Sequence, residues 1–206
     1  MIRSSRTAAL ALAVSLAVAS CTTGSHDDDA SRPSSRSGPV PLENLRAIPL
    51  QGDPLEELGD GVEAEGTRPV AELRIGGDRL VTYLDRKSCG LAVTGPGEVG
   101  FGLKAAWPED DGDAQIDLPG GPYAQASSMS SFERRSTWTQ LSCGKRAMVV
   151  EYGARDARAA TSGARGAMSV VRPRDGKTWF VVVGPKDVRA GIAAKLSAWR
   201  PADVPR

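Results

Sequence analysis

Histidine is the side chain on which much nucleophilic and zinc chemistry in proteins depends, and this chain of 206 residues contains one, His26. Ser-His-Asp and Cys-His catalysis need an imidazole that the fold holds beside the nucleophile, and zinc hydrolases use histidine ligands. His26 precedes three aspartates in a stretch that is too polar to fold. The sequence therefore predicts no histidine-dependent catalysis, no metal site and no cofactor.

Ser142 and Lys145 match the Ser-x-x-Lys motif of penicillin-binding proteins and β-lactamases. In those families the serine opens a helix, which places the lysine amine over the serine hydroxyl. Here the surrounding sequence alternates like a strand, and Cys143 lies inside the motif. The other motifs are missing, because there is no Ser-Asp-Asn and Lys177-Thr178 precedes tryptophan instead of glycine. We therefore expect no acyl-enzyme chemistry at Ser142.

Paired carboxylates are the remaining catalytic groups that the chain offers. A glycosidase needs two of them about 5–9 Å apart. Glu133, Glu151 and Asp156 are candidates, but the sequence does not bring any two of them together. A cell-wall hydrolase that uses a carboxylate pair is therefore kept as an alternative function.

Residues 109–117 form an acidic loop whose oxygen ligands alternate as they do in calcium loops. The sharp-turn glycine of such loops is replaced by Ile116, and the bidentate glutamate is replaced by Pro122. A solvated loop is the better interpretation, with calcium binding left open.

The chain has three cysteines, and Cys21 belongs to the N-terminal segment discussed below. The other two, Cys89 and Cys143, can pair with each other. Their separation excludes a C-x-x-C redox motif and does not fit a metal pair. In an oxidising compartment they would form a disulfide that closes a 55-residue loop. Such a bridge contributes about 4 kcal/mol on the chain-entropy model. Two free thiols are the alternative.

The N-terminus has the three parts of an export signal. Arg3 and Arg6 give a positive start, and residues 8–18 are apolar except for one serine, which is too short to span a bilayer. Val18-Ala19-Ser20-Cys21 follows, and it resembles the lipobox of bacterial lipoproteins. The resemblance implies that Cys21 carries diacylglycerol and becomes the N-terminus of a membrane-anchored, extracytoplasmic protein. The alternative is an ordinary secreted protein with a coincidental cysteine.

Charge and composition limit the possible partners. Removal of residues 1–20 changes the net charge from +1 to −1, because two arginines and no acids are lost. A nearly neutral chain is not suited to nucleic acid. Of the 26 basic residues 20 are arginine, and this bias indicates a high-GC genome, as in high-GC Gram-positive bacteria.

The composition divides the chain into four parts. They are a signal peptide (1–20), a lipidated flexible tether (21–41), an extended or irregular segment (42–69) and one globular α+β domain (70–206). The tether contains no apolar side chain longer than alanine before Val40. It cannot bury enough surface to offset its ordering entropy.

Strand patterns dominate the globular domain. Period-two alternation predicts strands at 70–75 and 80–84. Further strands are expected at 89–93, 138–143, 148–152, 167–171 and 178–183. We expect residues 95–131 to be the least structured part, and residues 154–162 to form a short surface helix. The stretch 179–183 is apolar on both faces and should be a central strand.

The last predicted element is a helix that opens at Gly184-Pro185 and stops at Pro201. Val188, Ile192, Leu196 and Trp199 form one apolar stripe along it. We expect the stripe to pack on the sheet, with a membrane-surface helix as the alternative.

The sequence thus predicts an α+β fold, with an antiparallel sheet of six to eight strands, one disulfide and a C-terminal helix packed on the sheet. The expected function is non-enzymatic: a lipid-anchored envelope protein that binds a protein or a wall polymer. A small-ligand carrier is a further alternative.

Overall fold

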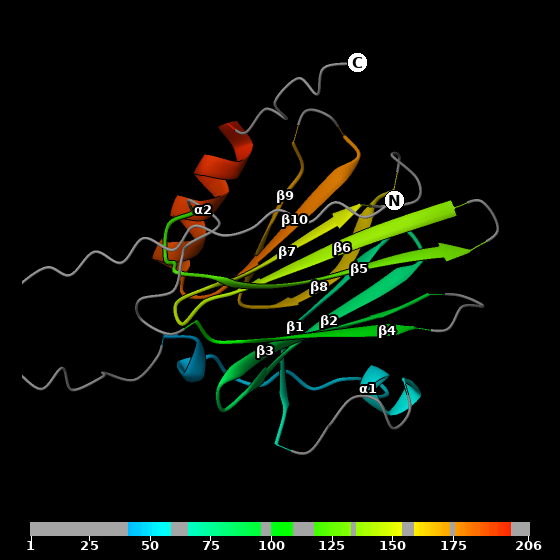
Figure 1. The fold of residues 1–206 in the computed structure, drawn as a ribbon, viewed down its shortest axis with the longest axis horizontal. Helices are drawn as coiled ribbons and strands as arrows, with labels where there is room; N and C mark the ends of the chain where they lie inside the picture. Colours follow the sequence, from blue (N-terminus) through cyan, green and yellow to red (C-terminus); the bar gives the residue numbers. More distant parts are fainter. Residues whose placement is uncertain are drawn as a thin grey trace, which may run out of the picture. The chain divides into compact units, whose positions relative to one another are not determined.

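Ten antiparallel strands in the described part of the chain form two five-stranded sheets, in a computed structural model (Figure 1). The structure describes residues 41–58, 66–95, 100–108, 118–132, 135–153, 159–173 and 176–198. All of them fall within one compact unit, Ser37–Arg206. The predicted signal peptide, Cys21, nearly all of the tether and the acidic loop 109–117 lie outside the described residues.

The first sheet, sheet A, is built from the N-terminal meander and one later strand. In spatial order it contains β4 (Phe101–Ala106), β3 (Ser88–Thr94), β2 (Asp78–Asp85), β1 (Arg68–Ile75) and β8 (Thr161–Gly166). The β1–β2 hairpin turns at Gly76-Gly77, where Gly76 has a φ of 63°. Because this backbone region favours glycine, the turn and the register of the meander follow from the local sequence.

The second sheet, sheet B, is built from the C-terminal half. In spatial order it contains β5 (Ala124–Phe132), β6 (Arg135–Cys143), β7 (Met148–Gly153), β10 (Thr178–Val183) and β9 (Met168–Val171). Every residue of β10 is buried and the strand lies between two neighbours, which confirms the predicted central strand.

The main core lies between the two sheets. Alternate residues of their strands point inward, and members of both sheets, among them Leu73, Leu91, Val150 and Val181, are at most 2 % exposed. Tyr152 of sheet B donates a hydrogen bond to Asp78 of sheet A, so a polar contact also joins the sheets. Burial and the bond to Asp78 raise the pKa of Tyr152 well above its usual value.

A helix and an irregular segment cover the two outer faces. Helix α2 (Lys186–Ala198) packs Val188, Ile192 and Leu196 against sheet B, which confirms the predicted packing (Figure 1). The segment before β1 contains a 3-10 turn (Pro41–Asn44) and a single helical turn, α1 (Pro54–Glu57). Its Leu55 packs on Val81, Tyr83 and Ala92 of sheet A.

The α+β architecture and the packed helix confirm the predicted fold class, but three details of the prediction are wrong. The described residues form ten strands in two sheets, not six to eight in one. Residues 95–131 contain β4 and β5. Thr161 and Ser162, expected in a surface helix, lie in β8. In both regions cross-strand pairing outweighs the weak local preference of Ser-, Gly- and Ala-rich sequence.

Candidate functional site

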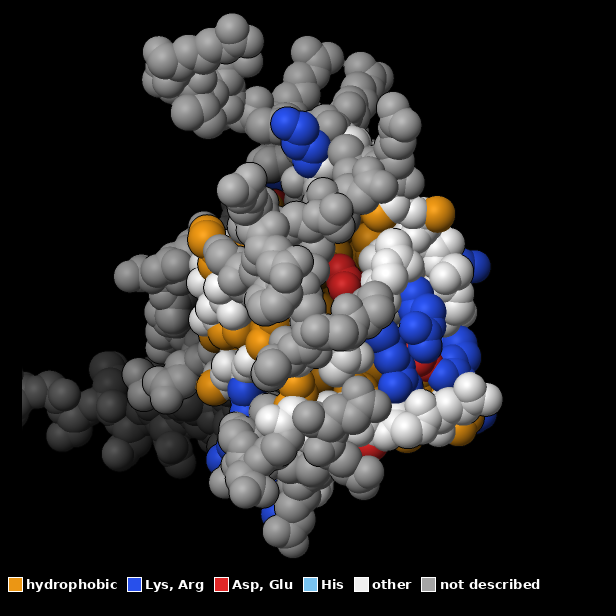
Figure 2. All heavy atoms as spheres, turned by 90° about the vertical axis from the view of Figure 1, so that its right-hand side faces the viewer, with side chains coloured by type: hydrophobic (Ala, Val, Ile, Leu, Met, Phe, Trp, Pro, Cys, Tyr) orange, Lys and Arg blue, Asp and Glu red, His pale blue; other side chains and the backbone are white. Residues whose placement is uncertain are grey.

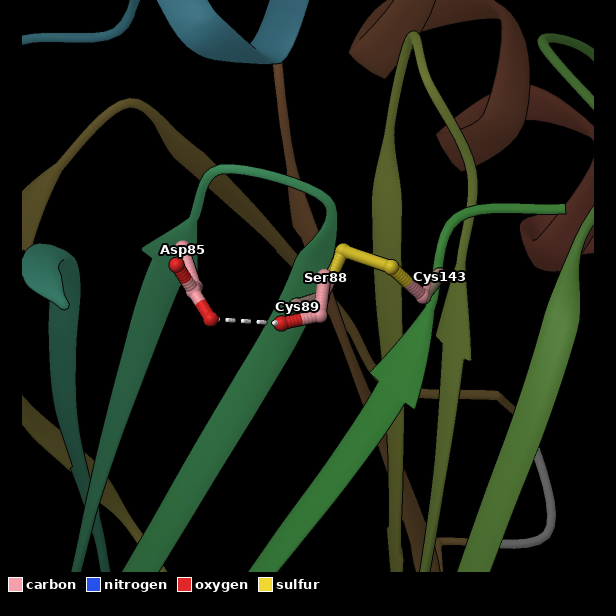
Figure 3. Close-up of a disulfide and its surroundings, with 4 residues drawn as sticks. All are labelled: Asp85, Ser88, Cys89 and Cys143. Atoms are coloured by element: carbon pink, nitrogen blue, oxygen red, sulfur yellow. Dashed lines mark hydrogen bonds between the residues drawn. A yellow bond between two sulfur atoms is a disulfide. The ribbon is translucent and has the colours of Figure 1, made fainter. Parts of the chain in front are cut away.

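The predicted disulfide is present and connects the two sheets (Figure 3). Cys89 is the second residue of β3, after Ser88, and Cys143 is the last residue of β6. Their Cα atoms are 5.6 Å apart. Both cysteines are 0 % exposed. Because the bond is buried and spans 54 positions of sequence, it stabilises the sandwich and is not placed for exchange with solvent thiols.

The Ser-x-x-Lys sequence has no helical geometry. Ser142 is the penultimate residue of β6 and is 4 % exposed, while Lys145 lies in the turn after the strand. A strand followed by a turn does not stack a lysine amine over a hydroxyl as one helical turn does. The strand-like context expected from the sequence is therefore confirmed.

The candidate carboxylates are only partly described. Glu151 lies half-buried on β7, opposite Gln140 and Phe180. Glu133 and Asp156 lie outside the described residues. The carboxylate-pair hypothesis consequently stays a prediction.

A charged cluster on the outer face of sheet A is the best-defined polar site in the described part of the chain. Glu72 of β1 is 5 % exposed and accepts hydrogen bonds from two arginines. The Nε of Arg79 lies 2.8 Å from its Oε1, and the Nη2 of Arg165 donates to its Oε2. Arg79 also donates from Nη2 to the carbonyl oxygen of Gly52, at 3.1 Å. The carboxylate thus fixes guanidinium groups from two other strands.

The pKa of Glu72 follows from these contacts. Burial by itself would raise it, but the hydrogen bonds and positive charges of Arg165 and Arg79 outweigh burial and hold the pKa below its ordinary value. Glu72 is therefore ionised at neutral pH. One carboxylate between two guanidinium groups leaves an excess of one positive charge.

The strand register adds two more polar residues to this face. Arg74 lies directly opposite Arg79 on β2, and its side chain is exposed. On the other side of β1 the pairing shifts, so that Arg165 opposes Glu72 and Ser162 opposes Arg74. This irregularity places the side chains of Ser162 and Arg165 on the same face, although a regular strand would put them on opposite faces. We call Glu72, Arg74, Arg79 and Arg165 the arginine cluster.

A shallow recess with a volume of about 20 Å³, open on one side, lies on the same sheet at the opposite end of β2. The recess is lined by Leu55, Thr67, Tyr83, Asp85, Ser88, Gly90, Leu91, Leu103 and Lys104. The Tyr83 hydroxyl donates to Asp53, 2.9 Å away. Burial and this bond raise the Tyr83 pKa well above its usual value, so the phenol stays neutral.

Asp85, Ser88 and Lys104 form the polar end of this recess. The backbone N–H of Arg86 donates to Asp85, and Lys104 lies 3.1 Å from its Oδ2. These contacts lower the pKa of Asp85. The Ser88 hydroxyl is 3.4 Å from Asp85, longer than a normal O–H···O bond (Figure 3). The geometry can bind a polar group, but Asp85 is engaged by Lys104 and is not poised to activate Ser88.

Comparisons of this chain with known proteins identify no relative. No family model, curated protein or solved structure matches the chain. The site must therefore be interpreted from its own residues.

The sequence did not identify the arginine cluster, because Glu72 and Arg74 read as the solvated face of an alternating strand. The hairpin at Gly76-Gly77 already implies that Arg74 lies opposite Arg79. This pairing of two arginines was the one local indication of the cluster. The contact with Arg165 spans 93 positions and had no local signal.

Proposed function

We propose that this protein is a lipid-anchored, extracytoplasmic protein of the cell envelope that acts by binding rather than by catalysis. The observation that carries the proposal is the buried Cys89–Cys143 disulfide in a chain whose residues 18–21 resemble a lipobox. A bridge of this kind persists in an oxidising compartment, and export is what a lipobox implies. Both features support the proposed extracytoplasmic location.

The anchor and the tether would give the domain its working range. Two acyl chains suffice for stable anchoring. A flexible tether of about 20 residues has a root-mean-square length of roughly 25 Å, which lifts a binding face off the bilayer and toward the wall. The part of the chain that the structure describes contains no helix long and apolar enough to span a membrane.

The outer face of sheet A is the proposed binding face. It carries the arginine cluster at one end of β2 and the recess at the other, and the buried Val81, on which Leu55 packs, lies between them. Its ionised groups already engage one another, as Glu72 does with Arg79 and Asp85 with Lys104. Such pairs fix side chains in place, and this favours recognition over acid–base catalysis.

A carrier for a small apolar ligand is not favoured. One hollow between the sheets, lined in part by Leu91, Val150 and Val181, has a volume of about 10 Å³. Small-molecule pockets measure roughly 300–1,000 Å³. The space between the sheets is filled mainly by the core side chains.

Cell fractionation tests the anchor. The Cys21→Ser variant should leave the membrane fraction and appear as soluble protein or uncleaved precursor. Ser20→Ala keeps two small residues before the cysteine and should fractionate like the wild type. If Cys21→Ser stays in the membrane fraction as the wild type does, the lipoprotein assignment is wrong.

Crosslinking in cells, followed by mass spectrometry, tests the binding role. We expect wild-type protein to capture an envelope protein or wall fragment that Cys21→Ser does not capture. Turnover of purified wall polymer by the protein would instead support the hydrolase alternative.

A further inference from the structure

We propose that the arginine cluster on sheet A is a binding site for a phosphate group. This inference rests on the proposal that the protein acts by binding, but it does not require the lipid anchor. Its residues come from three neighbouring strands: Arg79 from β2, Glu72 and Arg74 from β1, and Ser162 and Arg165 from β8.

The first argument is the charge balance. Two guanidinium groups, those of Arg79 and Arg165, contact the one carboxylate, and Arg74 adds a third positive charge on the same face, which leaves an excess of two positive charges. Arg74 and Arg79 are directly opposed across the β1–β2 pair, an arrangement of like charges that destabilises a sheet. Glu72 pairs with Arg79 and Arg165, while the Arg74 guanidinium has no hydrogen-bond or ion-pair partner among the described residues. An oxyanion ligand would supply the missing negative charge.

The second argument is preorganisation. Glu72 and Arg79 have side chains only 7 % and 9 % exposed, and each is held by further contacts. Glu72 binds both arginines, and Arg79 is also fixed by the Gly52 carbonyl oxygen. Because Glu72 holds the Arg165 guanidinium in place, that group loses little side-chain entropy when a ligand binds. Its planar set of N–H donors matches the oxygens of a phosphate.

The third argument is access. Strand β8 is exposed along its whole length, and most of its residues are small. Gly163, with a φ of 63°, lies at the irregularity that turns Ser162 and Arg165 to the same face, and there is open space where its Cβ would be. Basic side chains gather around a small acidic area at the right of Figure 2, as the register places Arg74, Arg79 and Arg165 around Glu72. A ligand can thus reach the Arg74 and Arg165 side chains from solvent.

The phosphate could belong to a soluble or polymeric ligand or to a lipid headgroup, and the chemistry at the arginines is the same. In either case the ligand accepts hydrogen bonds from Arg74 and Arg165, with Ser162 at the edge. Arg79 and Glu72 position these groups and contribute charge.

The test is calorimetric titration of the full chain, purified in non-ionic detergent, at constant ionic strength. The probes are inorganic phosphate, inorganic polyphosphate and dihexanoyl phosphatidylglycerol below its micellar concentration, with dihexanoyl phosphatidylcholine as the zwitterionic control. We expect binding of phosphate probes that Arg74→Ala weakens about tenfold. Arg146→Ala removes another exposed arginine, from the turn between β6 and β7, and should change the affinity less than twofold.

Further variants separate the phosphate site from simple charge attraction. Arg165→Lys keeps the charge but loses the planar donor pair, so it should also weaken binding. Tighter binding of polyphosphate than of phosphatidylglycerol would identify a phosphate polymer as the source, and the reverse order would identify a lipid headgroup. The proposal is overturned if no phosphate probe binds, or if Arg74→Ala and Arg146→Ala weaken binding equally. A protein that fractionates as a lipoprotein but binds no phosphate would refute this site and leave the anchor standing.

Discussion

Replacing Glu72 with glutamine should destabilise the domain strongly, because it leaves a buried guanidinium without its counter-ion. The side chains of Glu72 and Arg79 are 7 % and 9 % exposed, so their pair is nearly desolvated. Breaking a buried ion pair by removing one partner costs about 3–5 kcal/mol. Arg165 is 41 % exposed and can turn to water, and Arg79 keeps its bond to Gly52. We therefore expect a loss near the lower limit, about 3 kcal/mol.

The stability difference between the wild type and Glu72→Gln should depend on pH. The folded-state pKa of Glu72 lies below the reference value of 4.5. Its stabilising contribution is thus fully present above pH 4.5 and is lost as the pH falls through the folded-state pKa. The wild type should consequently lose its advantage over Glu72→Gln as acid protonates the carboxyl group. At neutral pH the melting temperature should fall by roughly 6–12 °C for a domain of this size.

Thermal and urea unfolding between pH 3 and 7 would measure both effects. Glu43→Gln is the matched control, because Glu43 is exposed and only its backbone carbonyl accepts a bond from Arg68. That variant should change stability by less than about 0.5 kcal/mol. A Glu72→Gln effect below about 1 kcal/mol, or one of equal size at pH 3 and pH 7, would refute the reasoning.

Two other contacts between the sheets make measurable contributions. Replacing Cys89 and Cys143 together with alanine should cost about 4 kcal/mol in unfolding free energy, and a reductant should then have no further effect on the variant; a variant as stable as the oxidised wild type would contradict this. Tyr152→Phe removes the hydroxyl that donates to Asp78 and should cost about 1.5–3 kcal/mol, measured by urea unfolding; an effect under about 0.5 kcal/mol would show that water replaces the bond without loss.

The sequence predicts those parts of the fold that depend on neighbouring residues. Gly76-Gly77 and the alternation around it define the β1–β2 hairpin, and the apolar stripe of α2 defines its buried face. The disulfide could be inferred because only two cysteines remain after Cys21. The hairpin and the helix stripe each depend on residues that are close in sequence. The disulfide has no alternative pairing, because no other cysteine remains.

Strands β5 and β8 show where this reasoning stops. Both are edge strands, and β8 is exposed throughout, so neither needs the apolar alternation that identifies a half-buried strand. They exist because β6 and β1 offer unpaired backbone groups, which is a property of the assembled sheets. The division into two sheets likewise depends on long-range pairing.

The arginine cluster was hidden for the same reason. Arg165 reaches Glu72 only after β8 pairs with β1 and the register shifts near Gly163. An acidic residue in an alternating strand is usually solvated, and its burial here follows from the neighbouring strands. Sequence patterns indicated the strands β1 and β2, but not the site that they form with β8.

The most direct test of the account is the intact mass of the protein purified from the membranes of its own cells. The account predicts a chain that begins at Cys21 and carries the added mass of a diacylglycerol group on that residue. A chain that begins at another residue, or that has an unmodified Cys21, would contradict the proposal of a lipid-anchored envelope protein.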